Sequence, residues 1–202
     1  MVESSRETRV RDGRAWPIGR EREIAWIMDG TDDGGVKVTC AIPPLFAAYW
    51  TLELPYSGDD DWDQNEVDQF PSDVIDVLAA DTSEQPWWLG FLQRGDHSDI
   101  IFPDAHRVVI YNGGYVLVQA GPRQAGIWRN TKDHSPPERL PDVMFPENRL
   151  WLASNLWDDD WTYFGGPAKI QRGFLEHPRL RHRVRAVGVD DPDATPPGHI
   201  AI

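Results

Sequence analysis

The hydrophobic and polar positions of this chain follow the same order twice. One copy extends from Phe102-Pro103-Asp104 to Gly121-Pro122, and the other extends from Phe145-Pro146-Glu147 to Gly166-Pro167. Between these ends, each copy has two short apolar segments separated by a polar turn, which predicts a β-hairpin. The closing glycine-proline step predicts the start of a helix. We therefore expect two ββα units, which suggest an internal duplication.

Hairpins of this kind bury one face and need a covering layer. The sequence therefore predicts an α+β fold in which antiparallel β-hairpins pack against short covering helices. The first hairpin is expected over residues 107–119, with its turn at Asn112-Gly113-Gly114, and the second over residues 149–164. Their helices are expected over residues 122–129 and from Pro167 onward.

Shorter periodic segments predict the remaining elements. Residues 20–28 place Ile24, Ile27 and Met28 on one face of a helix. The acid-rich segment 56–69 is too polar for a core element and predicts a surface loop. Further helices are expected from Pro71 and over 176–187, and further strands over 36–40, 49–54 and 86–92.

The 202 residues are enough for one domain with a sizeable core. We expect a single α+β domain over residues 19–188. Residues 1–18 carry mixed charge with little periodicity, so they predict a flexible N-terminal arm. Residues 189–202, which are rich in proline and aspartate, predict a loosely ordered C-terminal tail.

Composition narrows the class of protein. No apolar run approaches the roughly 18 residues of a membrane span, and the charged N-terminus is not followed by the apolar stretch of a secretory signal. The single Cys40 excludes an intrachain disulfide and a multi-cysteine metal site. These features predict a cytoplasmic protein that does not bind membranes.

Charge is unevenly distributed. The chain has a net charge of −13, and within residues 29–84 fourteen acidic residues face one basic residue, Lys37. This balance disfavours nucleic-acid binding, which needs concentrated positive potential. A basic protein partner, a cation or solubility alone suits the acidic segment better. The segment 169–185 has the opposite balance, with six basic residues and only Glu176 as an acid.

One short motif, three aspartates followed by tryptophan, occurs at 59–62 and again at 158–161. Tryptophan beside carboxylate can grip arginine or lysine through cation–π contact and ion pairing, and it can also bind sugars. The competing interpretations are a divalent cation site, or tryptophans that fill the core while the acids shape a turn. The candidate binding residues are Asp60, Asp61, Trp62, Trp157, Asp158, Asp159, Asp160 and Trp161.

Other catalytic patterns are weak. The histidines lack two-ligand zinc spacing, and His97 in the turn 95–99 has the residue types of an acid–base group without further support. No glycine-rich phosphate loop follows a strand, and no nucleophile elbow is present. The sequence therefore predicts no bound cofactor and no metal.

Five short sequence segments stand out together: residues 22–27, 41–44, 86–90, 102–105 and 156–161. They resemble a family of hypothetical proteins from actinomycete-type bacteria, and the resemblance covers roughly residues 20–175. It implies an intact intracellular bacterial domain and supplies no catalytic residues.

Two functions remain open. The first is a non-enzymatic binding protein that presents an acidic, tryptophan-rich face to a protein partner, in an immunity-protein-like or adaptor role. The alternative is an enzyme or carbohydrate-binding protein that uses Asp158, Asp159 or Asp160 with Trp157 and Trp161, with or without a divalent cation. The two differ in whether the acids line a pocket or a surface.

Overall fold

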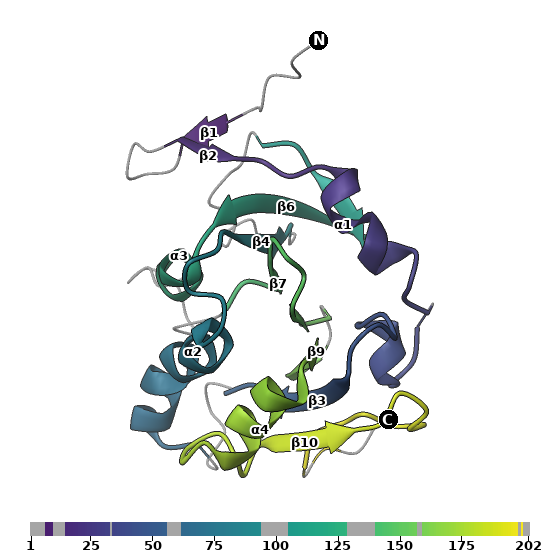
Figure 1. Cartoon of the computed structure of the whole chain (residues 1–202), viewed down its shortest axis with the longest axis vertical. Helices are drawn as coiled ribbons and strands as arrows, with labels where there is room; N and C mark the ends of the chain where they lie inside the picture. Colours follow the sequence, from purple (N-terminus) through teal and green to yellow (C-terminus); the bar gives the residue numbers. More distant parts are fainter. Residues whose placement is uncertain are drawn as a thin grey trace.

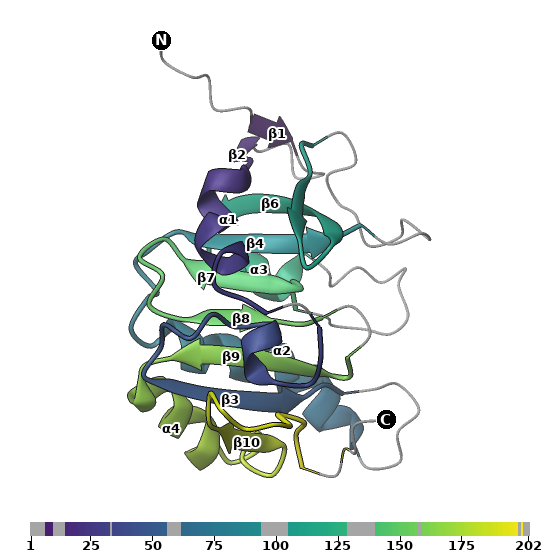
Figure 2. The ribbon, with the colours of Figure 1, turned by 90° about the vertical axis from the view of Figure 1, so that its right-hand side faces the viewer.

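Eight strands form one antiparallel sheet that extends from one end of the molecule to the other (Figure 1, Figure 2). The computed structural model describes residues 7–9, 15–32, 34–55, 62–93, 105–128, 140–156, 159–197 and 199. The strand order is β10-β3-β9-β8-β7-β4-β6-β5. The strands are β3 (Ala48–Glu53), β4 (Trp87–Leu92), β5 (Val108–Ile110), β6 (Gly113–Ala120), β7 (Val143–Pro146), β8 (Leu152–Ser154), β9 (Trp161–Gly166) and β10 (Val184–Val187).

Helices cover both faces of this sheet (Figure 1). On one face lie α2 (Gln64–Ala79), α3 (Pro122–Ile127) and α4 (Ala168–Glu176). On the other face lie α1 (Glu21–Met28) and the short 3-10 helix η1 (Val38–Cys40). Because both faces are covered, strands such as β4 are apolar on both sides, as strands buried on both faces are. The α+β class predicted from the sequence is confirmed.

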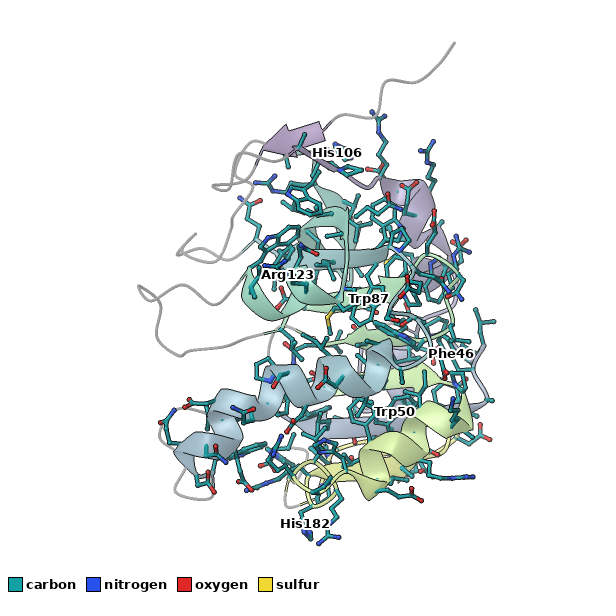
Figure 3. All side chains as sticks on the ribbon, turned by 60° about the vertical axis from the view of Figure 1, so that its left-hand side comes forward. Phe46, Trp50, Trp87, His106, Arg123 and His182 are labelled. Atoms are coloured by element: carbon teal, nitrogen blue, oxygen red, sulfur yellow. The ribbon has the colours of Figure 1, made fainter. Side chains whose placement is uncertain are left out.

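Along the central strands of the sheet, alternate residues enter two separate cores. In β4, Trp87, Leu89 and Phe91 face the core under α2, whereas Leu92 faces the core under α1. The first core is rich in large aromatics: Trp50 stacks on Phe164 with ring centroids 5.3 Å apart, and Trp87 meets Trp151 edge-on at 4.6 Å. Figure 3 shows Trp50 and Trp87 among the side chains of this layer.

Both predicted hairpins form, and a helix follows each of them. Strands β5 and β6 pair and lead into α3, and strands β8 and β9 pair and lead into α4. In the first hairpin, Ile110 pairs with Gly113, so the turn residues are Tyr111 and Asn112, both with positive φ. The turn thus lies one residue earlier than predicted. That the two units superpose stays a prediction.

The predicted strand over 36–40 is wrong. Residues 38–40 form η1, and Val38, Thr39 and Cys40 are all buried, so the apolar alternation did not mark one face of a strand. Gly34 and Gly35 have φ of 71° and 107°, a conformation that favours glycine, and they turn the chain just before η1.

Helix α2 begins seven residues before the predicted start at Pro71. The Asp63 carboxylate accepts a hydrogen bond from the Glu66 amide at 2.8 Å and caps the helix. Pro71 therefore lies inside α2, where it is buried. The residues 64–69, expected in a loop, are helical, while residues 56–61 lie outside the described part of the chain.

The predicted helix over 176–187 is also wrong. His177 precedes Pro178 and is extended, with ψ of 132°, because proline disfavours the helical conformation in the residue before it. Turns follow, and β10 then pairs with β3. Within the described residues, no helix is long and apolar enough to cross a membrane.

Both ends of the chain make contacts with the domain. Strand β2 (Ala15–Pro17) pairs with β1 (Glu7–Arg9), and Ile18 bridges to Val118 of β6. Near the C-terminus, Ala194 and Thr195 are buried, although the sequence predicted a loosely ordered tail there. The Ala194 amide donates to the Val36 carbonyl at 2.8 Å, which ties this segment to the loop before η1.

Candidate functional site

The structure describes four of the eight predicted site residues. Trp62 lies just before α2, Trp161 opens β9, and Asp159 and Asp160 immediately precede it. Asp60, Asp61, Trp157 and Asp158 lie outside the described residues.

The two tryptophans lie near one buried acid that the sequence analysis did not single out. Glu53 ends β3, with 7% of its surface exposed, and its register partner across the sheet is Trp161. The Leu54 amide donates to the Asp160 carbonyl at 2.8 Å, which holds the end of β3 against the start of β9.

A cation connects Glu53 to Trp62. The Arg183 side chain donates from Nη1 to Glu53 Oε2 at 2.8 Å, and its guanidinium lies over the Trp62 ring at 4.5 Å. A backbone bond from the Glu53 amide to the Arg183 carbonyl at 3.1 Å supports this pair. Trp62 is half-buried and packs edge-on against Phe70 of α2.

A second potential cation connects Glu53 to Trp161. His199 Nε2 lies 3.3 Å from Glu53 Oε1, and its ring centroid lies 5.6 Å from that of Trp161. We call Glu53, Trp62, Trp161, Arg183 and His199 the Glu53 cluster. Its members come from β3, β9 and three segments outside the helices and strands, and the sheet register, with the folding back of the segment 194–199, brings them together.

Several buried polar atoms at this end make no hydrogen bond of good geometry, although the Tyr163 hydroxyl interacts with Trp161 and Asp159. They include Trp161 Nε1 and Tyr163 Oη, whose rings lie 5.9 Å apart, and Trp62 Nε1. Burial raises the pKa of Tyr163, and the nearby Asp159 carboxylate raises it further.

Burial also raises the pKa of the Cys40 thiol, with smaller contributions from Asp32 and Asp159. Cys40 is thus a neutral thiol, and Asp159 lies close enough to influence both groups.

In the second Asp-Asp-Asp-Trp motif, the described acids are more exposed than the Trp161 ring. Asp160 is exposed and Asp159 is half-buried, whereas Trp161 exposes only 9% of its surface. Trp161 is therefore a core residue with acids at its rim. A sugar could not stack on its ring unless neighbouring groups moved.

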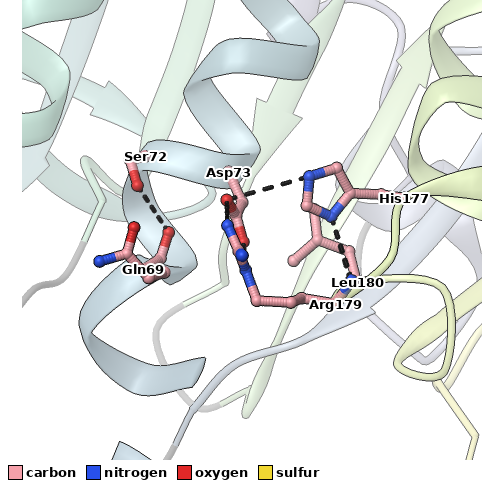
Figure 4. A network of polar contacts seen from close by, with 6 residues as sticks. All are labelled: Gln69, Ser72, Asp73, His177, Arg179 and Leu180. Atoms are coloured by element: carbon pink, nitrogen blue, oxygen red, sulfur yellow. Dashed lines mark hydrogen bonds and ion pairs between the residues drawn. The ribbon is translucent and has the colours of Figure 1, made fainter. Parts of the chain in front are cut away.

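A second polar network is structural (Figure 4). Buried Asp73 of α2 accepts two hydrogen bonds from the Arg179 guanidinium, one of them from Nε at 2.6 Å. His177 Nε2 lies 3.9 Å from Asp73 Oδ1, and its Nδ1 accepts from the backbone amides of Arg179 and Leu180. Both ring nitrogens are engaged, so the network anchors the turn after α4 to α2.

Sequence reasoning missed Glu53, Arg183 and His199. Glu53 stands alone at the end of an apolar strand, and 130 residues separate it from Arg183 and 146 from His199. No local pattern joins such distant residues.

Metal-binding geometry is missing from the part of the chain that the structure describes, where no three His, Cys, Asp or Glu side chains are placed to hold an ion. The chain matches no protein-family model, no curated protein and no solved structure.

Proposed function

We propose that this chain is a non-enzymatic binding protein that presents an acidic face to a basic protein partner, in an immunity-like or adaptor role. The observation that carries the proposal is the charge of α2 and its neighbours. The described segment 62–93 contains seven acidic residues and no lysine or arginine.

Only part of this negative charge is balanced by other segments. Asp73 is buried against Arg179, and Asp81 pairs with Lys169 at 2.8 Å. Asp68 and Asp76 lie on the exposed side of α2, opposite its buried residues, and Glu84 is exposed in the turn that follows. Such a surface attracts a basic partner and disfavours an acidic one.

The Glu53 cluster supports the same chemistry. Within its own fold, the chain holds a guanidinium between a carboxylate and a tryptophan ring. This arrangement combines ion pairing with cation–π contact, which strengthens as water is excluded. The acidic helix begins two residues after Trp62, next to this cluster.

The burial of Trp161 favours this proposal over the carbohydrate-binding or hydrolytic alternative. A sugar platform needs an open aromatic face, and the described ring of the second motif has little exposed surface.

The test compares two triple variants of equal net charge. One, the α2 variant, replaces two exposed acids of α2 and one of the turn after it (Asp68→Asn, Asp76→Asn, Glu84→Gln), and the matched control replaces exposed acids elsewhere (Glu147→Gln, Glu176→Gln, Asp190→Asn). Partners are captured from extract of the native cells, purified, and titrated against each variant at several salt concentrations.

We expect the α2 variant to weaken binding by about tenfold or more and to reduce its salt dependence. The control variant should stay within about twofold of the parent. Equal weakening by both triples would mean that only total charge matters. Capture of an acidic partner, or no change in either triple, would overturn the proposal.

A further inference from the structure

Glu53 contacts two nitrogen-bearing side chains, one on each carboxylate oxygen. Arg183 binds Oε2 and lies over the Trp62 ring, while His199 Nε2 contacts Oε1 and its ring lies tilted beside Trp161. The tryptophan of each Asp-Asp-Asp-Trp motif thus lies beside a side chain that contacts Glu53.

Arg183 and His199 contact the Glu53 carboxylate at different distances. The Arg183 contact with Glu53 is 2.8 Å, whereas the His199 contact is 3.3 Å. On the His199 side, Trp161 is nine-tenths buried, yet its Nε1 makes no hydrogen bond of good geometry. Buried polar groups are normally paired, so the fit at this place is incomplete.

His199 also lies beyond the firm anchors of its segment. The Ala194 amide donates to Val36 at 2.8 Å, and Arg185 donates to the Thr195 carbonyl at 2.9 Å. The bonds that position the His199 backbone are longer: 3.3 Å to the Pro196 carbonyl and 3.4 Å from the Thr195 hydroxyl. The hydrogen bonds at His199 are thus longer than those that hold residues 194–195.

A guanidinium suits this place better than an imidazole. It carries five N–H donors and stays charged, so one donor can bind Glu53 Oε1 while the planar group packs against Trp161. The exposed Asp160, directly before Trp161, adds negative charge at the rim. Arg183 already does the equivalent on Oε2 with Trp62.

We propose that His199 is a displaceable internal occupant of a guanidinium-binding site made by Glu53 and Trp161, and that an arginine side chain of the partner takes its place. The identity of the arginine donor rests on the proposed function, whereas the site itself can be tested without a protein partner.

The experiment titrates the full chain with N-acetyl-arginine amide and follows the indole N–H signal of Trp161 by NMR, assigned from its loss in Trp161→Phe. N-acetyl-citrulline amide, which has the same shape without the charge, is the control probe. The variants are His199→Ala, which removes the imidazole from the site beside Glu53 Oε1, and His199→Arg, which puts a guanidinium of the chain itself there.

We expect the arginine probe to shift the Trp161 signal, and His199→Ala to lower its dissociation constant by about tenfold, because a competing internal state is removed. His199→Arg should abolish the shift, and citrulline should cause none. Equal response in all three proteins, or no response in any, would overturn the inference.

The outcome is separable from that of the proposed function. If a basic partner binds through α2 while the arginine probe never shifts Trp161, this site fails and the function stands. If the probe behaves as expected while the α2 triple binds partners like its control, the site stands and the α2 face fails.

Discussion

The two Asp-Asp-Asp-Trp copies end in tryptophans with different structural roles. Trp62 is followed by the helix cap Asp63, so its half-buried ring leans on Phe70 at the start of α2. Trp161 is followed by Thr162, Tyr163 and Phe164, which alternate between the two faces of β9, and its ring is buried in the core under α1 and η1. A repeated motif therefore need not give a repeated structure, because the residues that follow it decide the local conformation.

Substituting each tryptophan gives the largest difference between the two copies. Trp161→Ala should lower the free energy of unfolding by about 3–5 kcal/mol, as expected for a buried aromatic. Trp62→Ala should cost about 1–2 kcal/mol, since its ring is only partly buried and one face lies against Arg183. Urea denaturation of both variants checks this, and equal losses would contradict the distinction.

Removing the shared acid should also be costly. Glu53→Ala leaves two groups without their carboxylate partner and should cost about 2–4 kcal/mol. Double-mutant cycles then apportion the loss: coupling to Arg183 should reach about 1–2 kcal/mol, and coupling to His199 should stay below about 0.5 kcal/mol. The reverse order of couplings would show that His199 is the firmer occupant.

Two tyrosines sharpen the comparison further. The Tyr111 hydroxyl donates to the Ala41 carbonyl and accepts from Ser154 Oγ at 3.1 Å, so Tyr111→Phe should cost about 1–3 kcal/mol. Tyr163→Phe removes a hydroxyl that makes no hydrogen bond of good geometry and should be neutral or stabilising. Thermal melts of both variants decide, and a large loss in Tyr163→Phe would reveal a bond at that hydroxyl.

The smallest effect concerns acid pH and the segment that carries His199. The Thr195 amide donates to Asp193 Oδ1 at 2.8 Å and lowers the pKa of that carboxyl below its ordinary value of 3.8. A lowered pKa means that the ionised form stabilises the fold at pH above the ordinary value. This contribution is lost as pH falls through the folded-state pKa.

Asp193→Ala should therefore flatten the decline of stability below about pH 4 and leave the rest of the pH profile unchanged. Unfolding measurements across that range give the comparison. An unchanged slope in the variant would show that Asp193 is not linked to folding.

Local patterns predicted much of the sheet. Alternation and turn residues correctly indicated β3, β4 and the two hairpins, because those signals lie within a few neighbouring residues. They failed at η1, where three consecutive residues are buried, and at β10, where a strand was taken for a helix. Pairing with β3 determines the second case, and that pairing is not local.

Local sequence patterns likewise identified some residues of the candidate site and missed others. Asp159, Asp160, Trp161 and Trp62 stand out in the sequence because acid and tryptophan are adjacent there. Glu53 and its two partners do not, since the pairing of β3 with β10 brings Arg183 to Glu53 and the folding back of the segment 194–199 brings His199 there.

The position of β3 also bears on how the chain is made. Both of its neighbours in the sheet, β9 and β10, come from residues 161–187, while β3 itself ends at Glu53. On the ribosome, this apolar strand leaves the exit tunnel more than a hundred residues before either partner. Its two edges must stay unpaired until residues 161–187 have been made, so chains stalled before residue 161 should aggregate or recruit chaperones.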